Sequence, residues 1–314
     1  PVLMLGHVLV MILAALSGSS LWIRAILLIA LFYPLSSRLY NRQESDSDLV
    51  TKESIKVVSF NLLRFDERKL FYDDTKLYEA DFKAWLKAQD ADVLCLQEYN
   101  YFKGDRRNIT WKWFEEQGYR YFVGNATRSA ALTGPVIIAK YPLINKDYKD
   151  FGALNGLVSA DMIVGQDTLS IVSVHLHSMT LKLGDLLHQK SMEKTKEIGK
   201  VTVDKMKEGW EKRKLEVVDL EDKIASTNHP LIICGDFNET PFSYVYGKIS
   251  DLLSNAFEEK GSGFGFTFNQ LPYFIRIDNQ FFDASRLAIT SFVTDTKVKF
   301  SDHYPIVGTY EIKR

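Results

Sequence analysis

Short apolar runs that border polar clusters recur along this chain, and each run has the length of a buried β-strand. Carboxylates, amides or a histidine stand beside each run. At the end of a strand that is buried on both faces, such groups cost free energy unless they bond to partners or a ligand. The runs and their clusters are residues 231–234 with Gly235-Asp236-Phe237-Asn238, residues 55–58 with Ser59-Phe60-Asn61, residues 93–96 with Gln97-Glu98, and residues 304–307 preceded by Ser301-Asp302-His303. The pattern predicts a functional site where these strands end.

The segments between these runs carry further periodic patterns. Leu77, Phe82, Trp85 and Leu86 recur at helical spacing and predict a helix over residues 75–88. Successive strands are predicted over residues 119–123, 135–139, 157–164 and 169–175.

Residues 181–226 do not show the short, strand-like apolar patterns of the preceding segments. Eleven basic and ten acidic side chains lie between Lys182 and Lys223, among scattered apolar ones. This composition is typical of long, solvated helices. Because one helix would be unusually long for a globular domain, the segment predicts a helical pair with a break near Gly209.

The amino-terminal segment, residues 1–37, contains no Asp, Glu or Lys. Its two apolar runs, residues 8–16 and 26–32, are each shorter than the 18 or so residues of a clean membrane-spanning helix. Together they predict a transmembrane helical hairpin, in which Arg24 reaches the interface. A signal peptide is the alternative, but no basic region precedes the first run. We therefore expect a membrane protein, and the basic residues leave the side of the catalytic domain open.

The remaining chain divides into a polar, acidic linker over residues 38–53 and a domain over residues 54–314. That length suits one large α/β domain. Cys95 and Cys234 each lie inside a predicted buried strand, which favours inert core thiols over a disulfide or a zinc site.

Net charge bears on the substrate. Three of the 39 basic residues and none of the 40 acidic residues lie in residues 1–43, so the rest of the chain has a net charge of −4 with histidine neutral. Nucleic-acid binders usually show a basic surplus. Nucleic acid therefore stays possible as a substrate but is not favoured, and Arg106, Arg107 and Arg128 are the loop residues that could form a local basic patch.

The polar clusters supply oxygen ligands for a metal. Asn61, Glu98, Asp236, Asn238 and Asp302 offer carboxylate and amide oxygens. Such ligands suit Mg²⁺ or Mn²⁺, whereas zinc takes more His and Cys. The reaction class that these residues indicate is metal-assisted hydrolysis of a phosphate ester.

The order of the motifs resembles the endonuclease/exonuclease/phosphatase superfamily, which includes deoxyribonuclease-like and sphingomyelinase-like members. The motifs are Ser-Phe-Asn, Gln-Glu, Val-His-Leu, Gly-Asp-Phe-Asn, Arg-Ile-Asp and Ser-Asp-His, from about Ile55 to Lys313. The resemblance implies a four-layered α/β sandwich (α+β), with two packed β-sheets, outer helices and a site at one rim.

The resemblance also implies roles for single residues. Glu98 matches the principal metal ligand, with Asn61 and Asp302 beside it. Asp236 and Asn238 match the pair that handles the attacking water and the phosphoryl oxygens. His303 matches the histidine on the scissile phosphate, Asp278 the carboxylate that orients it, and His175 a second histidine that faces the phosphate. Asn279 stands where the family usually has an aromatic residue, and His177 is interpreted as a rim or packing residue.

Two classes of function stay open from the sequence. The favoured one is a metal-dependent phosphoesterase, either a nuclease or a hydrolase of phospholipids or small phosphoesters. The alternative is a catalytically silent, membrane-anchored binding module. A silent member is expected to have lost one of the site residues, and none is lost, so the sequence favours the enzyme.

Overall fold

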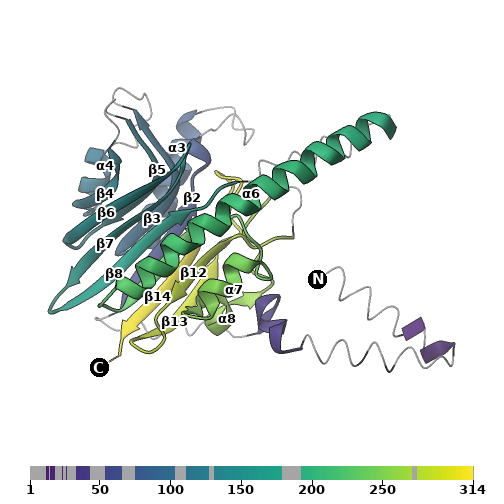
Figure 1. Ribbon diagram of the computed structural model, residues 1–314. Coiled ribbons are helices and arrows are strands. Elements are labelled where there is room, and N and C mark those ends of the chain that lie inside the picture. The colour runs from purple at the N-terminus through teal and green to yellow at the C-terminus, as the bar shows by residue number, and fades with distance from the viewer. Residues whose placement is uncertain are drawn as a thin grey trace.

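Two six-stranded β-sheets pack face to face in this computed structural model, which describes residues 12–13, 15–17, 23, 26, 33–42, 54–65, 75–102, 111–126, 131–178, 192–270 and 274–313 (Figure 1). The first sheet has the order β13-β14-β2-β3-β5-β4. Its strands are β2 (Ile55–Asn61), β3 (Val93–Phe102), β4 (Tyr121–Ala126), β5 (Ala131–Ala139), β13 (Leu287–Thr294) and β14 (Ile306–Ile312).

The second sheet has the order β10-β12-β9-β8-β7-β6. Its strands are β6 (Leu143–Gly152), β7 (Asn155–Val164), β8 (Asp167–His175), β9 (Leu231–Asp236), β10 (Ser254–Asn255) and β12 (Asp278–Phe282). Both sheets are mixed, because β2 pairs with β3 and β8 with β9 in parallel, while their other pairs are antiparallel. The predicted sandwich of two packed sheets is confirmed.

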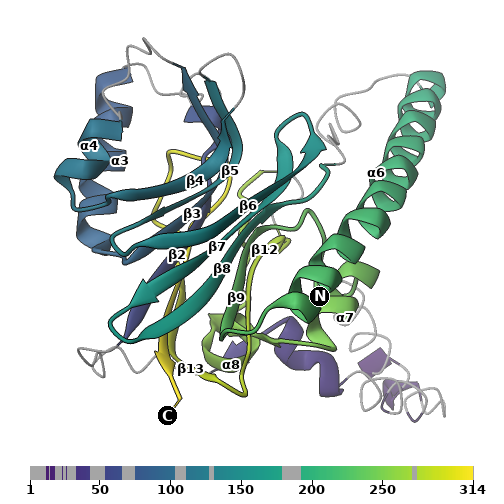
Figure 2. The ribbon, with the colours of Figure 1, turned by 60° about the vertical axis from the view of Figure 1, so that its left-hand side comes forward.

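Helices cover the outer faces of both sheets (Figure 2). α3 (Thr75–Gln89) and α4 (Trp111–Glu116) lie over the first sheet, while α6 (Met192–Ser226) and α7 (Tyr244–Ser250) lie over the second. The remaining short elements are α8 (Ala256–Lys260), η1 (Tyr33–Arg38), η2 (Leu63–Phe65) and the pair β1 (Asn41–Arg42) with β11 (Ser262–Gly263).

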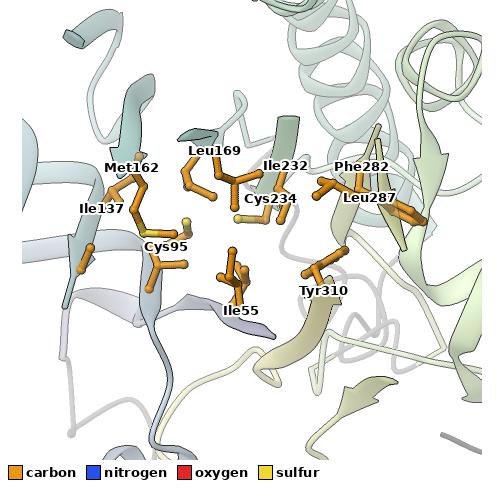
Figure 3. Packing of buried hydrophobic residues seen from close by; sticks show 14 of the residues in the cluster. Ile55, Cys95, Ile137, Met162, Leu169, Ile232, Cys234, Phe282, Leu287 and Tyr310 are labelled. Atoms are coloured by element: carbon orange, nitrogen blue, oxygen red, sulfur yellow. The ribbon is translucent and has the colours of Figure 1, made fainter. Parts of the chain in front are cut away.

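The main core lies between the two sheets, where Ile55, Ile137, Leu169 and Ile232 interdigitate (Figure 3). Cys95 and Cys234 are free, buried thiols of this core, as predicted. Burial raises the pKa of Cys95 well above its usual range, because a thiolate would lose its hydration there.

The helix over residues 75–88 and the strands over residues 119–123, 135–139, 157–164 and 169–175 are observed, with ends shifted by a few residues. The predicted break near Gly209 is wrong, because α6 runs unbroken from Met192 to Ser226. A mid-helix glycine costs about 1 kcal/mol. The buried residues Val217 and Leu220 fix the following turns on the second sheet, which offsets that cost.

The predicted membrane hairpin falls largely outside the described residues. Among those that are described, no helix combines the length and apolar character needed to cross a bilayer. Residues 33–42, by contrast, pack on the catalytic domain. Arg38 donates to the carbonyl of Pro241 at 3.2 Å, and Asn41 donates to the carbonyls of Phe257 and Glu258 at 2.9 and 2.7 Å.

Candidate active site

The strand register brings the predicted site residues to one edge of the sandwich. In the first sheet Asn61 stands opposite Gln97, and in the second sheet His175 stands opposite Asp236. Within each pair the two strands run parallel, so their carboxyl ends lie at the same edge of the sheet. Asp278 begins the antiparallel strand β12 directly opposite Asp236, so it reaches the same edge.

Asp236 lies at the centre of this edge and is 1% exposed. Its Oδ2 accepts a hydrogen bond from Nδ2 of Asn61 at 3.0 Å, and its Oδ1 accepts one from the backbone N–H of Asn238 at 2.9 Å. Nε2 of His175 lies 3.6 Å and Nε2 of His303 lies 3.7 Å from the same Oδ2. These two distances exceed a good hydrogen bond. The two rings and the carboxylate therefore converge without bonding directly.

His303 forms a buried pair with Asp278, whose Oδ2 lies 2.8 Å from Nδ1 of the ring. Burial disfavours the charged ring, but the carboxylates of Asp278, Asp236 and Asp302 outweigh this effect and raise the pKa of His303 well above its usual range. The ring is therefore protonated at neutral pH. Thr267 fixes the start of β12 beneath this pair, because its Oγ1 accepts the backbone N–H of Asp278 at 3.1 Å.

Asn279, which departs from the usual family residue, is buried and hydrogen-bonded. Its Oδ1 accepts from Nδ2 of Asn255 at 3.2 Å. The polar side chain therefore has a partner in the layer beneath Asp278.

His175 points one ring nitrogen at the backbone and the other at Asp236. Its Nδ1 lies 2.9 Å from the carbonyl of Leu154, so Nδ1 carries a proton and donates it. Its Nε2 is buried and has no hydrogen-bond partner among the described residues. Such an atom is suited to a ligand.

Glu98 does not stand at a strand end as the sequence pattern suggested, because β3 continues to Phe102. Leu96 pairs with Val136 and Tyr99 with Gly134, so Gln97 and Glu98 together face Pro135 in a β-bulge. Proline has no backbone N–H for the ladder, which is consistent with a break in pairing at this point.

Five of the non-glycine residues with positive φ in the described chain belong to this edge. They are Leu63, Arg64 and Phe65 in the turn after Asn61, with φ of 48°, 57° and 55°, and Glu98 and Asn238, with φ of 49° and 50°. Each such conformation costs of order 1–3 kcal/mol and persists only where surrounding structure enforces it. Strain of this kind is concentrated at functional sites.

The family resemblance assigns the cation to Glu98 and Asp302, and this assignment stays a prediction. Burial and the nearby charges of Glu98 and Asp236 raise the pKa of Asp302, although His303 opposes them. A divalent cation beside these carboxylates would relieve their repulsion. In this structure Nε of Arg64 lies 3.5 Å from Oε2 of Glu98.

A second group of ligand atoms comprises Asp236, Asp278 and His303, whose atoms lie within 4.8 Å of one another. Nδ1 of His303 and Oδ2 of Asp278 bond to each other, while Oδ1 of Asp278 is buried and has no hydrogen-bond partner among the described residues. The raised pKa of His303 opposes metal binding through its ring, and Oδ1 of Asp278 stays available to a ligand. Asn61 uses its amide to hold Asp236 and the backbone N–H of Leu63. Its role as a metal ligand stays a prediction.

The family model of the endonuclease/exonuclease/phosphatase family matches residues 58–303. The chain belongs to this family. Members of this superfamily are phosphoesterases that use divalent metals. No curated protein is significantly similar to the chain in sequence.

Solved structures of this superfamily share the fold at low identity. A Bacteroides vulgatus endonuclease/exonuclease/phosphatase is 16% identical over 83% of this chain and 100% of its own, with a TM-score of 0.60. The human Nocturnin catalytic domain with bound sulfate is 16% identical over 84% and 96%, with a TM-score of 0.59. Truncated Caenorhabditis elegans TDP2 is 16% identical over 82% and 98%, with a TM-score of 0.55.

Sequence reasoning missed two residues beside the site, Arg213 and Glu239. Arg213 lies in the charged segment that was interpreted as solvated, yet it is 1% exposed and pairs with Glu239 at 2.7 Å. Neither residue had a local signal, because an arginine among ten other basic residues looks like any other. Ser301 was named in its motif but given no role, and in the structure its Oγ donates to the carbonyl of Asn61 at 2.6 Å and joins two of the motifs.

Proposed function

We propose that this protein hydrolyses a phosphodiester or phosphomonoester by attack of water, with a divalent cation such as Mg²⁺ or Mn²⁺. The observation that carries the proposal is the convergence of His175 and His303 on Oδ2 of Asp236 at 3.6 and 3.7 Å. A water placed among these groups could donate to Oδ2 of Asp236 and to Nε2 of His175 and could accept from the ring of His303.

Each group has a chemical task in this proposal. Asp236, held by Asn61 and by the backbone of Asn238, is a fixed carboxylate that accepts the proton of the attacking water. His303 is a cation that faces the phosphoryl oxygen, and Asp278 keeps it charged and oriented. His175, whose Nδ1 donates to the carbonyl of Leu154, presents the unprotonated Nε2, which accepts a hydrogen bond from the attacking water.

Glu98 and Asp302 would hold the cation, which when bound supplies positive charge to the phosphoryl oxygen. Burial is the main cause of the raised pKa of Asp302, and the charge of Glu98 adds to it, so a cation held by both carboxylates would offset their repulsion. The metal's identity is part of the proposal.

The substrate class is narrowed by charge. Outside residues 1–43 the chain has a net charge of −4, which gives no general attraction for a long polyanion. This favours a phospholipid headgroup or a small phosphoester over long duplex DNA. The sulfate bound by the Nocturnin domain is a tetrahedral oxyanion like phosphate, which agrees with a phosphoester site on this fold.

A membrane location is proposed on the sequence of residues 1–37, which has no acidic residue or lysine. In this proposal the anchor keeps the site near lipid headgroups. Fractionation of cells that produce the full chain tests it. Recovery in the membrane fraction after a high-salt wash is expected, and recovery in the soluble fraction would contradict it.

The experiment that tests the function is a panel of substrates assayed with Mg²⁺, Mn²⁺ and a chelator. The panel contains phospholipids, small phosphodiesters, phosphomonoesters and plasmid DNA, the last over a range of salt. Metal-dependent hydrolysis of the first three classes is expected. Plasmid nicking alone, with a steep fall in rate as salt rises, would show a nuclease instead.

If no substrate in the panel is hydrolysed, the result would favour the second candidate, a silent binding module. The intact set of site residues argues against that candidate.

A further inference from the structure

Arg213 of α6 is a buried cation at the margin of the site. It is 1% exposed, and its guanidinium reaches in two directions. Nε donates to Oε1 of Glu239 at 2.7 Å, and Nη1 donates to the backbone carbonyl of His177 at 2.6 Å. A planar guanidinium can hold two acceptors at a fixed separation, which a lysine cannot do.

These two partners belong to the two loops that carry the site. His177 lies two residues after His175 at the end of β8, and Glu239 follows Asn238 at the end of β9. The loops are also bonded to each other nearer the site, because Nδ2 of Asn238 donates to the carbonyl of Leu176 at 2.9 Å. Arg213 therefore joins the two loops on the side that faces away from the reacting groups.

The rest of this turn of α6 binds the same loop. Oε2 of Glu216 accepts the backbone N–H of His177 at 3.0 Å, and Nζ of Lys212 lies 3.0 Å from Nε2 of the His177 ring. Burial and the charge of Lys212 lower the pKa of His177. This ring is therefore neutral and accepts from Lys212, in agreement with the interpretation of His177 as a packing residue.

We propose that Arg213 is a positioning residue, which sets the separation of the His175 loop from the loop of Asp236 and Asn238. It touches none of the reacting atoms. His175 and Asp236 are themselves paired in register at the ends of β8 and β9, and the backbone N–H of Leu176 donates to the carbonyl of Asp236 at 3.0 Å. Arg213 acts on the two loops that follow this pair, and through them on the side-chain geometry in which Nε2 of His175 lies 3.6 Å from Oδ2 of Asp236. This inference rests on the proposed function for its catalytic consequence, because an error of 1 Å in such a site can lower the rate by about a hundredfold.

The competing explanation is that Arg213 merely fastens α6 to the domain. Arg213→Met, Arg213→Lys and Glu239→Gln separate the two explanations when compared with Leu220→Ala. Leu220 lies on the same helix in the apolar core, seven residues further along. Its truncation leaves a cavity in a packed core and so destabilises the domain, as breaking a buried charge pair also does, but it removes no bond to either loop. Arg213→Lys and Glu239→Gln are milder changes and serve if Arg213→Met does not fold.

Two readouts are needed, both at a temperature well below every variant's Tm. The first is kcat and KM on whichever substrate the wild type hydrolyses. The Arg213 variants are expected to lose kcat by about 10- to 100-fold with little change in KM, whereas Leu220→Ala keeps a near-wild-type kcat. The second is hydrogen exchange of peptides covering residues 174–178 and 236–240. Both should exchange faster in the Arg213 variants and not in Leu220→Ala.

The positioning role is overturned if Arg213→Lys and Glu239→Gln keep full kcat, or if exchange rises no more in these two loops than it does in Leu220→Ala. A wild type without hydrolytic activity would refute the proposed function alone. Hydrogen exchange would then still decide whether Arg213 holds the two loops together.

Discussion

Nδ1 of His303 and Oδ2 of Asp278 lie 2.8 Å apart in a buried pair, and the other ring nitrogen of His303 faces Asp236. The pair joins two strands that belong to different sheets, since Asp278 begins β12 and His303 precedes β14. The charged state of His303 therefore depends on the packing of the two sheets against each other. The carboxylates around the ring keep its pKa raised.

Asp278→Asn should lower the pKa of His303, because it removes the nearest negative charge while keeping the size of the side chain. If hydrolysis needs the charged ring, the loss of activity at high pH should move to lower pH in this variant. His303→Ala should lose most activity at every pH. Profiles of kcat/KM against pH measure both effects, and a profile in Asp278→Asn that overlays the wild type would mean that the two residues are not coupled.

The same pair should also affect stability. A histidine whose pKa is raised in the folded state contributes stability fully below its unfolded pKa of about 6.5, and this contribution is lost as pH rises through the folded pKa. Burial raises the pKa of Asp278 itself, so at low pH its carboxyl is neutral, like the amide. The Asp278→Asn variant should therefore lose most stability relative to wild type near neutral pH, and the difference should shrink as pH falls and Asp278 becomes protonated. Urea denaturation at several pH values measures this difference, and a constant difference across pH would count against the charge pair.

Asp302→Asn should stabilise the protein while it impairs catalysis. The pKa of Asp302 is raised, so its carboxylate costs folding free energy once pH exceeds the unfolded value of about 3.9. Removing that charge should raise the free energy of unfolding at neutral pH in metal-free buffer, because a carboxylate with a raised pKa is costly to keep ionised in the folded state. The gain should vanish below pH 4.

Added Mn²⁺ gives a control for this prediction. It should raise the Tm of the wild type more than that of Asp302→Asn, because a ligand stabilises a fold in proportion to its affinity. Asp92 is the matched comparison, since burial raises its pKa too and it lies before β3, away from the site. Mn²⁺ should stabilise Asp92→Asn as much as wild type, and equal responses in all three proteins would remove Asp302 from the metal site.

Glu98→Gln should weaken metal binding and slow hydrolysis by about a hundredfold or more, because it keeps the shape of the side chain but removes its charge. Part of the lost rate should return at high metal concentration. Titration of activity with Mg²⁺ measures this. Near-wild-type turnover at a metal concentration that does not saturate a weakened site would refute the assignment of Glu98.

Much of this site was predictable because its residues lie in short motifs at strand ends. The runs before Asn61 and Asp236 are apolar throughout, and the parallel register then places these two residues at one edge. The strand β6 was not predicted, because its burial pattern is mostly exposed and gives no clean alternation. The bulge at Glu98 and the buried role of Arg213 depend on contacts between distant segments, which local patterns do not contain.

The continuous helix α6 also shows that contacts between distant segments can override a local sequence pattern. Propensity and length favoured a break at Gly209, but the anchoring of Arg213, Val217 and Leu220 on the second sheet outweighs a local cost of about 1 kcal/mol.

The most direct test of the central claim is a single-turnover measurement on the wild type and Asp236→Asn, with saturating Mg²⁺ and the best substrate of the panel. The amide keeps the size of the side chain and can still accept the hydrogen bond from Asn61, but it cannot take a proton from water. We predict a rate at least about a hundredfold lower at a temperature where both proteins are folded. The amide can accept only one of the two hydrogen bonds that Asn61 and Asn238 donate to Asp236, so a somewhat lower Tm is expected as well. A folded Asp236→Asn that turns over substrate at the wild-type rate would contradict the account.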